Sequence, residues 1–140
     1  MNSTNHAEAD ASIEITTVSN QGDGYSEFGS REFCLRGDAL RQLSEQQAAK
    51  NFRLRKSSAD YASDFHVAGD PTLLVILAGR VRLELRSGEY RDFGAGEMFI
   101  AEDYLKSGVV FSNKMHGHSA RVIGAQSLSA LHLKLQRREE

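Results

Sequence analysis

Hydrophobic and polar residues alternate along much of the second half of the chain. In the stretch RVRLEL, Val81, Leu83 and Leu85 fall on one side of an extended chain, and the charged residues between them fall on the other. A period of two is typical of a strand in a sheet that packs on one face and is solvated on the other. Glycine-containing turns separate this run from its neighbours, so residues 72–100 are predicted to form an antiparallel meander.

Two further runs extend the predicted sheet. The run LLVIL is apolar throughout, so both of its faces should be covered. The closing run LSALHLKL alternates, and its leucines are expected to face the core. By the same parity His132 and Lys134 should point outward, which makes His132 a surface histidine.

The first half of the chain gives weaker strand signals from about Ile13 onward, in SIEITTV, SEFGSREFCL and NFRLR. Residues 38–50 have helix-favouring composition and could form either a short helix or a long crossing loop. These patterns predict an all-β sandwich or barrel with at most one short helix. We expect a disordered leader over residues 1–12, one domain over 13–136, and a polar tail over 137–140.

Composition narrows the class of protein. A chain of 140 residues is the size of one domain, and 17 basic against 19 acidic residues leave no basic surface for nucleic acid. Cys34 is the only cysteine, which excludes a disulfide framework and a cysteine-based zinc motif. No apolar run is long enough to cross a bilayer, and no secretory signal is recognisable. The expectation is a cytoplasmic protein that binds neither nucleic acid nor membrane.

The sequence HGH at 116–118 is the first candidate for metal chemistry. Side chains two residues apart on a strand point to the same face, so His116 and His118 could reach one metal ion. Gly117 between them loosens that geometry.

Four segments, SDFH (63–66), LLVILAGRVRLEL (73–85), YRDFGAGEMFIAED (90–103) and GHSARV (117–122), resemble in order and spacing the cupin superfamily. More narrowly, the chain is similar to small single-domain cupins, mostly of unassigned function. The resemblance implies a cupin-type double-stranded β-helix, or jelly-roll barrel. Its mouth would hold a metabolite or a metal, and the protein would commonly be a homodimer.

The resemblance also implies a metal site, in altered form. His66 matches the first histidine of the first cupin motif and His118 the histidine of the second, whereas Ala68 and Thr72 stand where a further histidine and an acid are usual. With Glu102 as the carboxylate, His66 and His118 would form a three-residue site for iron, nickel, manganese or zinc. His116 then closes an inserted loop and is at most auxiliary.

Other residues are candidates for the pocket at the barrel mouth. Glu102 or Asp103 would act as a catalytic base, and Arg121 would meet an anionic group if it points inward. Candidates for an apolar wall are Tyr61, Phe65, Phe99, Tyr104 and Phe111.

The stretch from 104 to 117 is longer than in the cupins that the chain resembles. It could be a lid over the pocket, or else an extra strand or a dimer contact. In either case Val110 and Phe111 should not be freely solvated.

Two functions of different classes follow. One is a metal-dependent enzyme, an oxygenase, isomerase or lyase, acting on a small polar or carboxylated metabolite. The other is a ligand-binding or regulatory cupin that needs no metal. The two retained histidines favour the first, and the missing ligands at Ala68 and Thr72 favour the second.

Overall fold

The computed structural model describes residues 11–20 and 22–137. The predicted leader and the predicted tail therefore lie mostly outside the described residues. The described part contains strands, turns and irregular chain but no helix, and none of it could cross a membrane as a helix.

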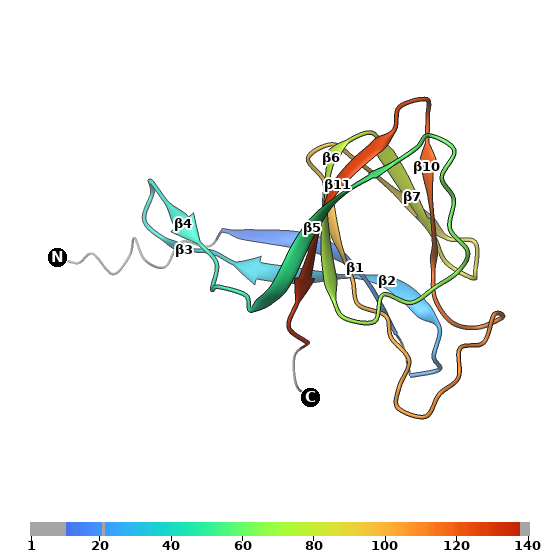
Figure 1. Cartoon of the computed structure of the whole chain (residues 1–140). Helices are drawn as coiled ribbons and strands as arrows, with labels where there is room; N and C mark the ends of the chain where they lie inside the picture. The colour runs from blue at the N-terminus through green and yellow to red at the C-terminus, as the bar shows by residue number, and fades with distance from the viewer. Residues whose placement is uncertain (1–10, 21, 138–140) are drawn as a thin grey trace.

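Six strands form the larger sheet, in the order β2-β1-β9-β6-β11-β5 (Figure 1). Their bounds are β1 Ser12–Asn20, β2 Ser26–Cys34, β5 Ala49–Ser57, β6 Thr72–Ala78, β9 Met98–Ala101 and β11 Leu128–Leu135. All pairings are antiparallel except that of β1 with β9.

Three strands form the smaller sheet, in the order β10-β7-β8. Their bounds are β7 Arg80–Glu84, β8 Tyr90–Gly94 and β10 Ser119–Ile123. Strands β6 to β11 pass back and forth between the two sheets, so that β6, β9 and β11 face β7, β8 and β10 (Figure 1). This strand order is a jelly-roll barrel, and the predicted all-β fold class is confirmed.

The core lies between the two sheets. Its buried members come from both, and Ile76 and Leu83 are each only 1% exposed. The full set is Val18, Ile76, Val81, Leu83, Leu85, Phe93, Phe99, Ala101, Val122, Leu128 and Ala130. The predicted inward face of RVRLEL is correct.

A second apolar cluster lies on the other face of the larger sheet. Ile15, Ile100 and Leu135 are its buried members, and Leu73 and Leu133 pack against them. In the sheet register Leu133 is opposite Leu73, and Leu73 is opposite Ile100, so these side chains share the outer face.

This placement reverses the prediction for β11. Leu133 and Leu135 belong to the outer cluster, whereas His132 and Lys134 line a cavity inside the barrel. The alternation is that of a strand, as predicted, but the inward face carries Leu128 and Ala130 followed by the polar His132 and Lys134. His132 is therefore not a surface histidine.

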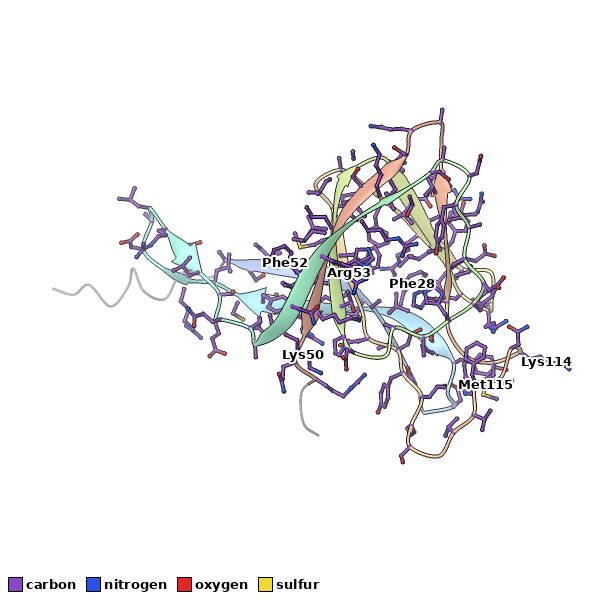
Figure 2. All side chains as sticks on the ribbon, in the orientation of Figure 1. Phe28, Lys50, Phe52, Arg53, Lys114 and Met115 are labelled. Carbon is purple, nitrogen blue, oxygen red and sulfur yellow. The ribbon has the colours of Figure 1, made fainter. Side chains whose placement is uncertain are left out.

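Strand β5 has the same reversed polarity. Figure 2 shows Phe52 and Arg53 on opposite sides of β5, with Arg53 toward the barrel. Phe52 and Leu54 are 65% and 68% exposed, while Arg53 and Arg55, with part of Leu54, line the inner cavity.

Residues 38–50 contain no helix. Part of this stretch forms a small hairpin, β3 Arg36–Gly37 with β4 Gln42–Leu43, which stands away from the barrel (Figure 1). The chain then runs as an exposed connection into β5, as the crossing-loop alternative predicted.

Candidate functional site

His66 and His118 lie side by side at one end of the barrel. His66 precedes β6 in a long connection, and His118 immediately precedes β10. Their backbones form a reciprocal pair: each N–H donates to the carbonyl of the other at 2.9 Å. The ring centroids are 4.8 Å apart with an interplanar angle of 52°. The backbone alone therefore holds the two imidazoles together.

Gly117 makes this close approach possible. Its φ of +89° lies in the left-handed region, and a Cβ there would fall 2.5 Å from the carbonyl oxygen of His66. A larger residue would push the two chain segments apart. This glycine, which appeared only to loosen the HGH motif, sets the position of His118 against His66.

A buried carboxylate orients His118. Asp103 has no exposed surface, and its Oδ2 accepts hydrogen bonds from His118 Nδ1 at 2.7 Å and Ser26 Oγ at 2.7 Å. Its Oδ1 accepts from the backbone N–H of Ala68 at 2.9 Å. Burial raises the pKa of Asp103, but the hydrogen bond and charge of His118, with the bonds from Ser26 and Ala68, lower it by more. Asp103 is thus an ionised acceptor at neutral pH.

The ring of His66 is also oriented by a hydrogen bond at Nδ1. Its Nδ1 is 2.9 Å from the carbonyl oxygen of Asp64, and a carbonyl can only accept, so Nδ1 carries the proton. Asp103 fixes the proton of His118 on Nδ1 in the same way. When these rings are neutral, Nε2 is the unprotonated nitrogen. No described residue donates to either Nε2, so both are available to a ligand.

The two histidines line a cavity of about 650 Å³ inside the barrel. Its floor is apolar and comes from both sheets, with Leu74, Ile76, Val81, Leu83, Phe99 and Leu128 among the lining residues. Tyr61 and Phe99, two of the predicted wall residues, line it as well. It is the concave space in which a small molecule would sit, and most of the β5 side chains that line it are exposed.

The wall from β5 and β11 is cationic. Arg53, Arg55, His132 and Lys134 all line the cavity, and no Asp or Glu among residues 11–20 and 22–137 does so. Arg53 and His132 are directly opposite in the sheet register, and the Arg55 guanidinium lies 4.8 Å from the centre of the Tyr61 ring. Burial lowers the pKa of His132, and the charges of Arg55, Lys134 and Arg53 lower it further. The cations therefore face one another without a carboxylate between them.

The structure does not bring the predicted three-residue metal set together. Glu102 follows Ile100 on the outer face, where it forms an ion pair with Arg31 at 2.5 Å, and it lines a different cavity from His66 and His118. Across the described ranges, no group of three or more His, Cys, Asp or Glu side chains could hold a metal ion. The two neighbouring acids, Glu102 and Asp103, point to opposite faces because the strand alternates.

The two predicted catalytic acids, Glu102 and Asp103, do not line the barrel cavity. Glu102 is outside the barrel, and both oxygens of Asp103 are used by the protein. Asp103 acts on the cavity through His118. In an extended chain Asp103 falls on the same side as Phe99, which the structure shows to be the inner side, so the sequence did carry a signal for it.

The four predicted ligand-binding residues do not line the barrel cavity. Phe65 lies under the guanidinium of Arg86, 3.9 Å from its ring centre, and Phe111 lies beside His116. Tyr104 lines the outer cavity, and Arg121 is exposed on β10. The places in the cavity lining that were predicted for those four residues are taken by Arg53, Arg55, His132 and Lys134. The sequence patterns give no role to the two arginines and place His132 and Lys134 outside.

The inserted stretch, residues 104–117, is an irregular loop that contributes nothing to the cavity lining. Arg86 holds it by donating to the carbonyl of His116 at 2.9 and 3.1 Å. Figure 2 shows Lys114 and Met115 in this loop, near the turn between β1 and β2. It is neither an added strand nor a wall of the cavity, and Val110 is 84% exposed, contrary to expectation.

A larger groove of about 1250 Å³ lies outside the barrel, between the β2–β4 region and the end of β11. Several of its charged groups already have partners, since Arg31 pairs with Glu102, and Arg137 donates to the carbonyl of Gly69. The inner cavity has unpaired cations and two oriented imidazoles, so it is the better candidate site.

No protein family model and no curated protein matches the chain. Among solved structures, a conserved Streptococcus pyogenes protein of unknown function, SPY1581, is 10% identical with a TM-score of 0.44, over 94% of this chain and 80% of that one. The cupin domain of Schizosaccharomyces pombe Cnp3 is 13% identical with a TM-score of 0.46, over 92% and 89% respectively. Neither similarity assigns a role to any residue of this chain.

Proposed function

We propose that this cupin-type protein binds a small carboxylated metabolite in the barrel cavity. The observation that carries the proposal is the composition of the lining: Arg53, Arg55 and Lys134 face the cavity and no carboxylate of the described chain balances them there. Guanidinium groups bind carboxylates through paired, charge-assisted hydrogen bonds. An anionic ligand would relieve the repulsion among these cations.

Binding can be tested by differential scanning fluorimetry with a panel of carboxylates and the corresponding neutral amides. The acids should raise the melting temperature and the amides should not. Arg53→Gln/Arg55→Gln should weaken binding of the acids at least tenfold, the loss expected for charged hydrogen bonds. The matched control is Arg91→Gln/Arg121→Gln, two arginines outside the cavity. Equal loss in both double variants would show that net charge, not the cavity, binds the acids.

A divalent metal is a second candidate, favoured by one observation. The Nδ1–H groups of His66 and His118 are held by a carbonyl and a carboxylate, the arrangement usual for metal-ligating histidines. Since Glu102 faces outward, these two Nε2 atoms are the protein ligands that remain, and the other positions would fall to water or to the metabolite. Metal content of untagged protein should then drop in His66→Ala/His118→Ala. Equal content in both proteins would exclude this metal site.

We propose further that two copies associate through the outer face of the larger sheet. In the register Phe52 is opposite Leu133 and Leu54 is opposite Leu131, so β5 and β11 carry a continuous apolar strip. A symmetric dimer buries the same strip on both copies. Light scattering should report a dimer for the wild type and for Val110→Glu, and a monomer for Phe52→Glu/Leu54→Glu. A monomeric wild type would contradict the proposal.

A further inference from the structure

The cavity lining has two chemically different sets of residues, called here the cationic end and the histidine end, which come from different parts of the fold. Arg53, Arg55, His132 and Lys134 belong to β5 and β11 of the larger sheet. His66 and His118 are joined to the smaller sheet, because His118 leads directly into β10. A ligand that contacts both ends therefore bridges the two sheets.

The histidine end offers acceptors. His66 Nδ1–H is committed to the carbonyl of Asp64, and His118 Nδ1–H to the carboxylate of Asp103. Each neutral imidazole presents the lone pair of Nε2, which requires a hydrogen-bond donor. A carboxylate would be a poor partner there, because it can only accept. This end therefore selects a different group from the one that the cationic end selects.

The acceptors are also preorganised. The reciprocal 2.9 Å backbone bonds fix the two rings relative to each other, and Asp103 is fully buried beneath His118 with three hydrogen-bond donors around it. Holding the acceptors in place before the ligand arrives reduces the entropic cost of binding. Buried groups built to bond a hydroxyl or N–H discriminate strongly against an analogue that lacks it.

The middle of the cavity does not require a hydrogen-bonding group on the ligand. Its floor consists of apolar side chains, including Leu74, Val81 and Phe99. These would contact the body of a ligand through van der Waals packing without specifying polar groups.

We infer that the ligand is two-ended: an acid whose anionic group meets the cationic end of the cavity lining and whose hydroxyl or N–H donor meets the histidine end. The anionic group lies at Arg53, Arg55 and Lys134, and the donor lies at the Nε2 atoms of His66 and His118. This inference rests on the proposed binding of a carboxylated metabolite, and it adds the second functional group.

Calorimetry with matched pairs of acids tests the second group. Three pairs differ only by a hydroxyl: 4-hydroxybutyrate and butyrate, 3-(4-hydroxyphenyl)propionate and 3-phenylpropionate, and 6-hydroxyhexanoate and hexanoate. With metal removed by chelation, the hydroxylated member should bind about tenfold more tightly in the pair whose length fits, the value of one good hydrogen bond.

Substitutions test whether the histidines cause the preference for the hydroxylated acid. His66→Phe keeps a ring at an exposed position but removes one of the two acceptors, so it should reduce the preference for the hydroxylated acid several-fold. Arg53→Gln should weaken both members of a pair equally, and Arg121→Gln should change neither.

The outcomes separate the two proposals. Equal affinity within every pair that binds, or a preference that is undiminished in His66→Phe, would overturn the two-ended ligand and leave anion binding in place. Absence of binding by all six acids and by the wider panel would overturn the proposed function and this inference with it.

Discussion

The smaller sheet and the β5–β11 wall have the same alternation and opposite polarity. In β7, Val81 and Leu83 face the core and Arg82 faces out, where it bonds to Asp92 at 2.7 and 3.0 Å. In β5, Arg53 faces in and Phe52 faces out. The first wall supports the fold and the second presents polar groups to the cavity.

The difference shows what a period of two does and does not establish. Alternation identifies an extended strand, because the pleat imposes it. Which side becomes the interior depends on what fills that interior. Where the core fills it, the apolar side is inside. Where a ligand cavity fills it, the polar side is inside, and the apolar side is left to outer packing or to a partner.

The largest expected effect comes from exchanging residue types between the two walls. Leu83→Arg places an unpaired charge at a position that is 1% exposed, so we expect a loss of more than about 4 kcal/mol of unfolding free energy, or no folded protein. Arg53→Leu should change stability by no more than about 0.5 kcal/mol, because this exposed arginine has no carboxylate partner in the described chain. Urea denaturation measures both.

If Arg53→Leu were as destabilising as Leu83→Arg, β5 would be a structural wall like β7, and the difference in role between the two walls would be contradicted. Anion binding supplies the control. Arg53→Leu should lose affinity for the acids while remaining folded, which separates a functional role from a structural one.

The next effect concerns the two neighbouring acids. Asp103→Ala removes the acceptor shared by His118, Ser26 and the Ala68 N–H, and should cost about 3 kcal/mol. Glu102→Ala breaks only a partly exposed pair with Arg31 and should cost about 1 kcal/mol or less. Chemical denaturation of the two variants at pH 7 tests this difference, and equal losses would contradict the inner role assigned to Asp103.

A smaller effect, on the pH dependence of stability, is expected from His132 in the cationic wall. The pKa of His132 is lowered in the folded protein, so the unfolded chain binds more protons once the pH falls below about 6.5. Stability should therefore decrease between pH 7 and pH 5. Above pH 7 both states are unprotonated and His132 contributes no pH dependence.

Nuclear magnetic resonance titration can isolate this histidine from the others. Arg53→Gln/Arg55→Gln removes two of the three charges that lower the pKa of His132, so that pKa should rise toward its usual value. A bound carboxylate should raise it as well. An unchanged pKa in the double variant would mean that burial and the charge of Lys134 are responsible.

The fold could be predicted from the sequence largely because turns and alternation are local properties. The all-β class followed from them, whereas the jelly-roll barrel was implied by the resemblance to cupins. The motif positions of His66 and His118 anticipated two residues that the structure places in contact. Three features could not be read in the same way. The inward side of β5 and β11 depends on the cavity, the choice between Glu102 and Asp103 depends on which side Phe99 faces, and the path of the inserted loop depends on its attachment to Arg86.

The smallest expected effect tests whether the loop takes any part in the site. Val110 is 84% exposed and residues 104–117 do not line the cavity, so Val110→Ser should leave ligand affinity and stability unchanged. Tyr61→Ala removes a cavity residue that contacts the Arg55 guanidinium, and should weaken acid binding several-fold through the lost cation–π contact. Calorimetry compares the two. A larger loss in Val110→Ser than in Tyr61→Ala would mean that the loop folds over the cavity when a ligand binds, and that the sheets alone do not form the site.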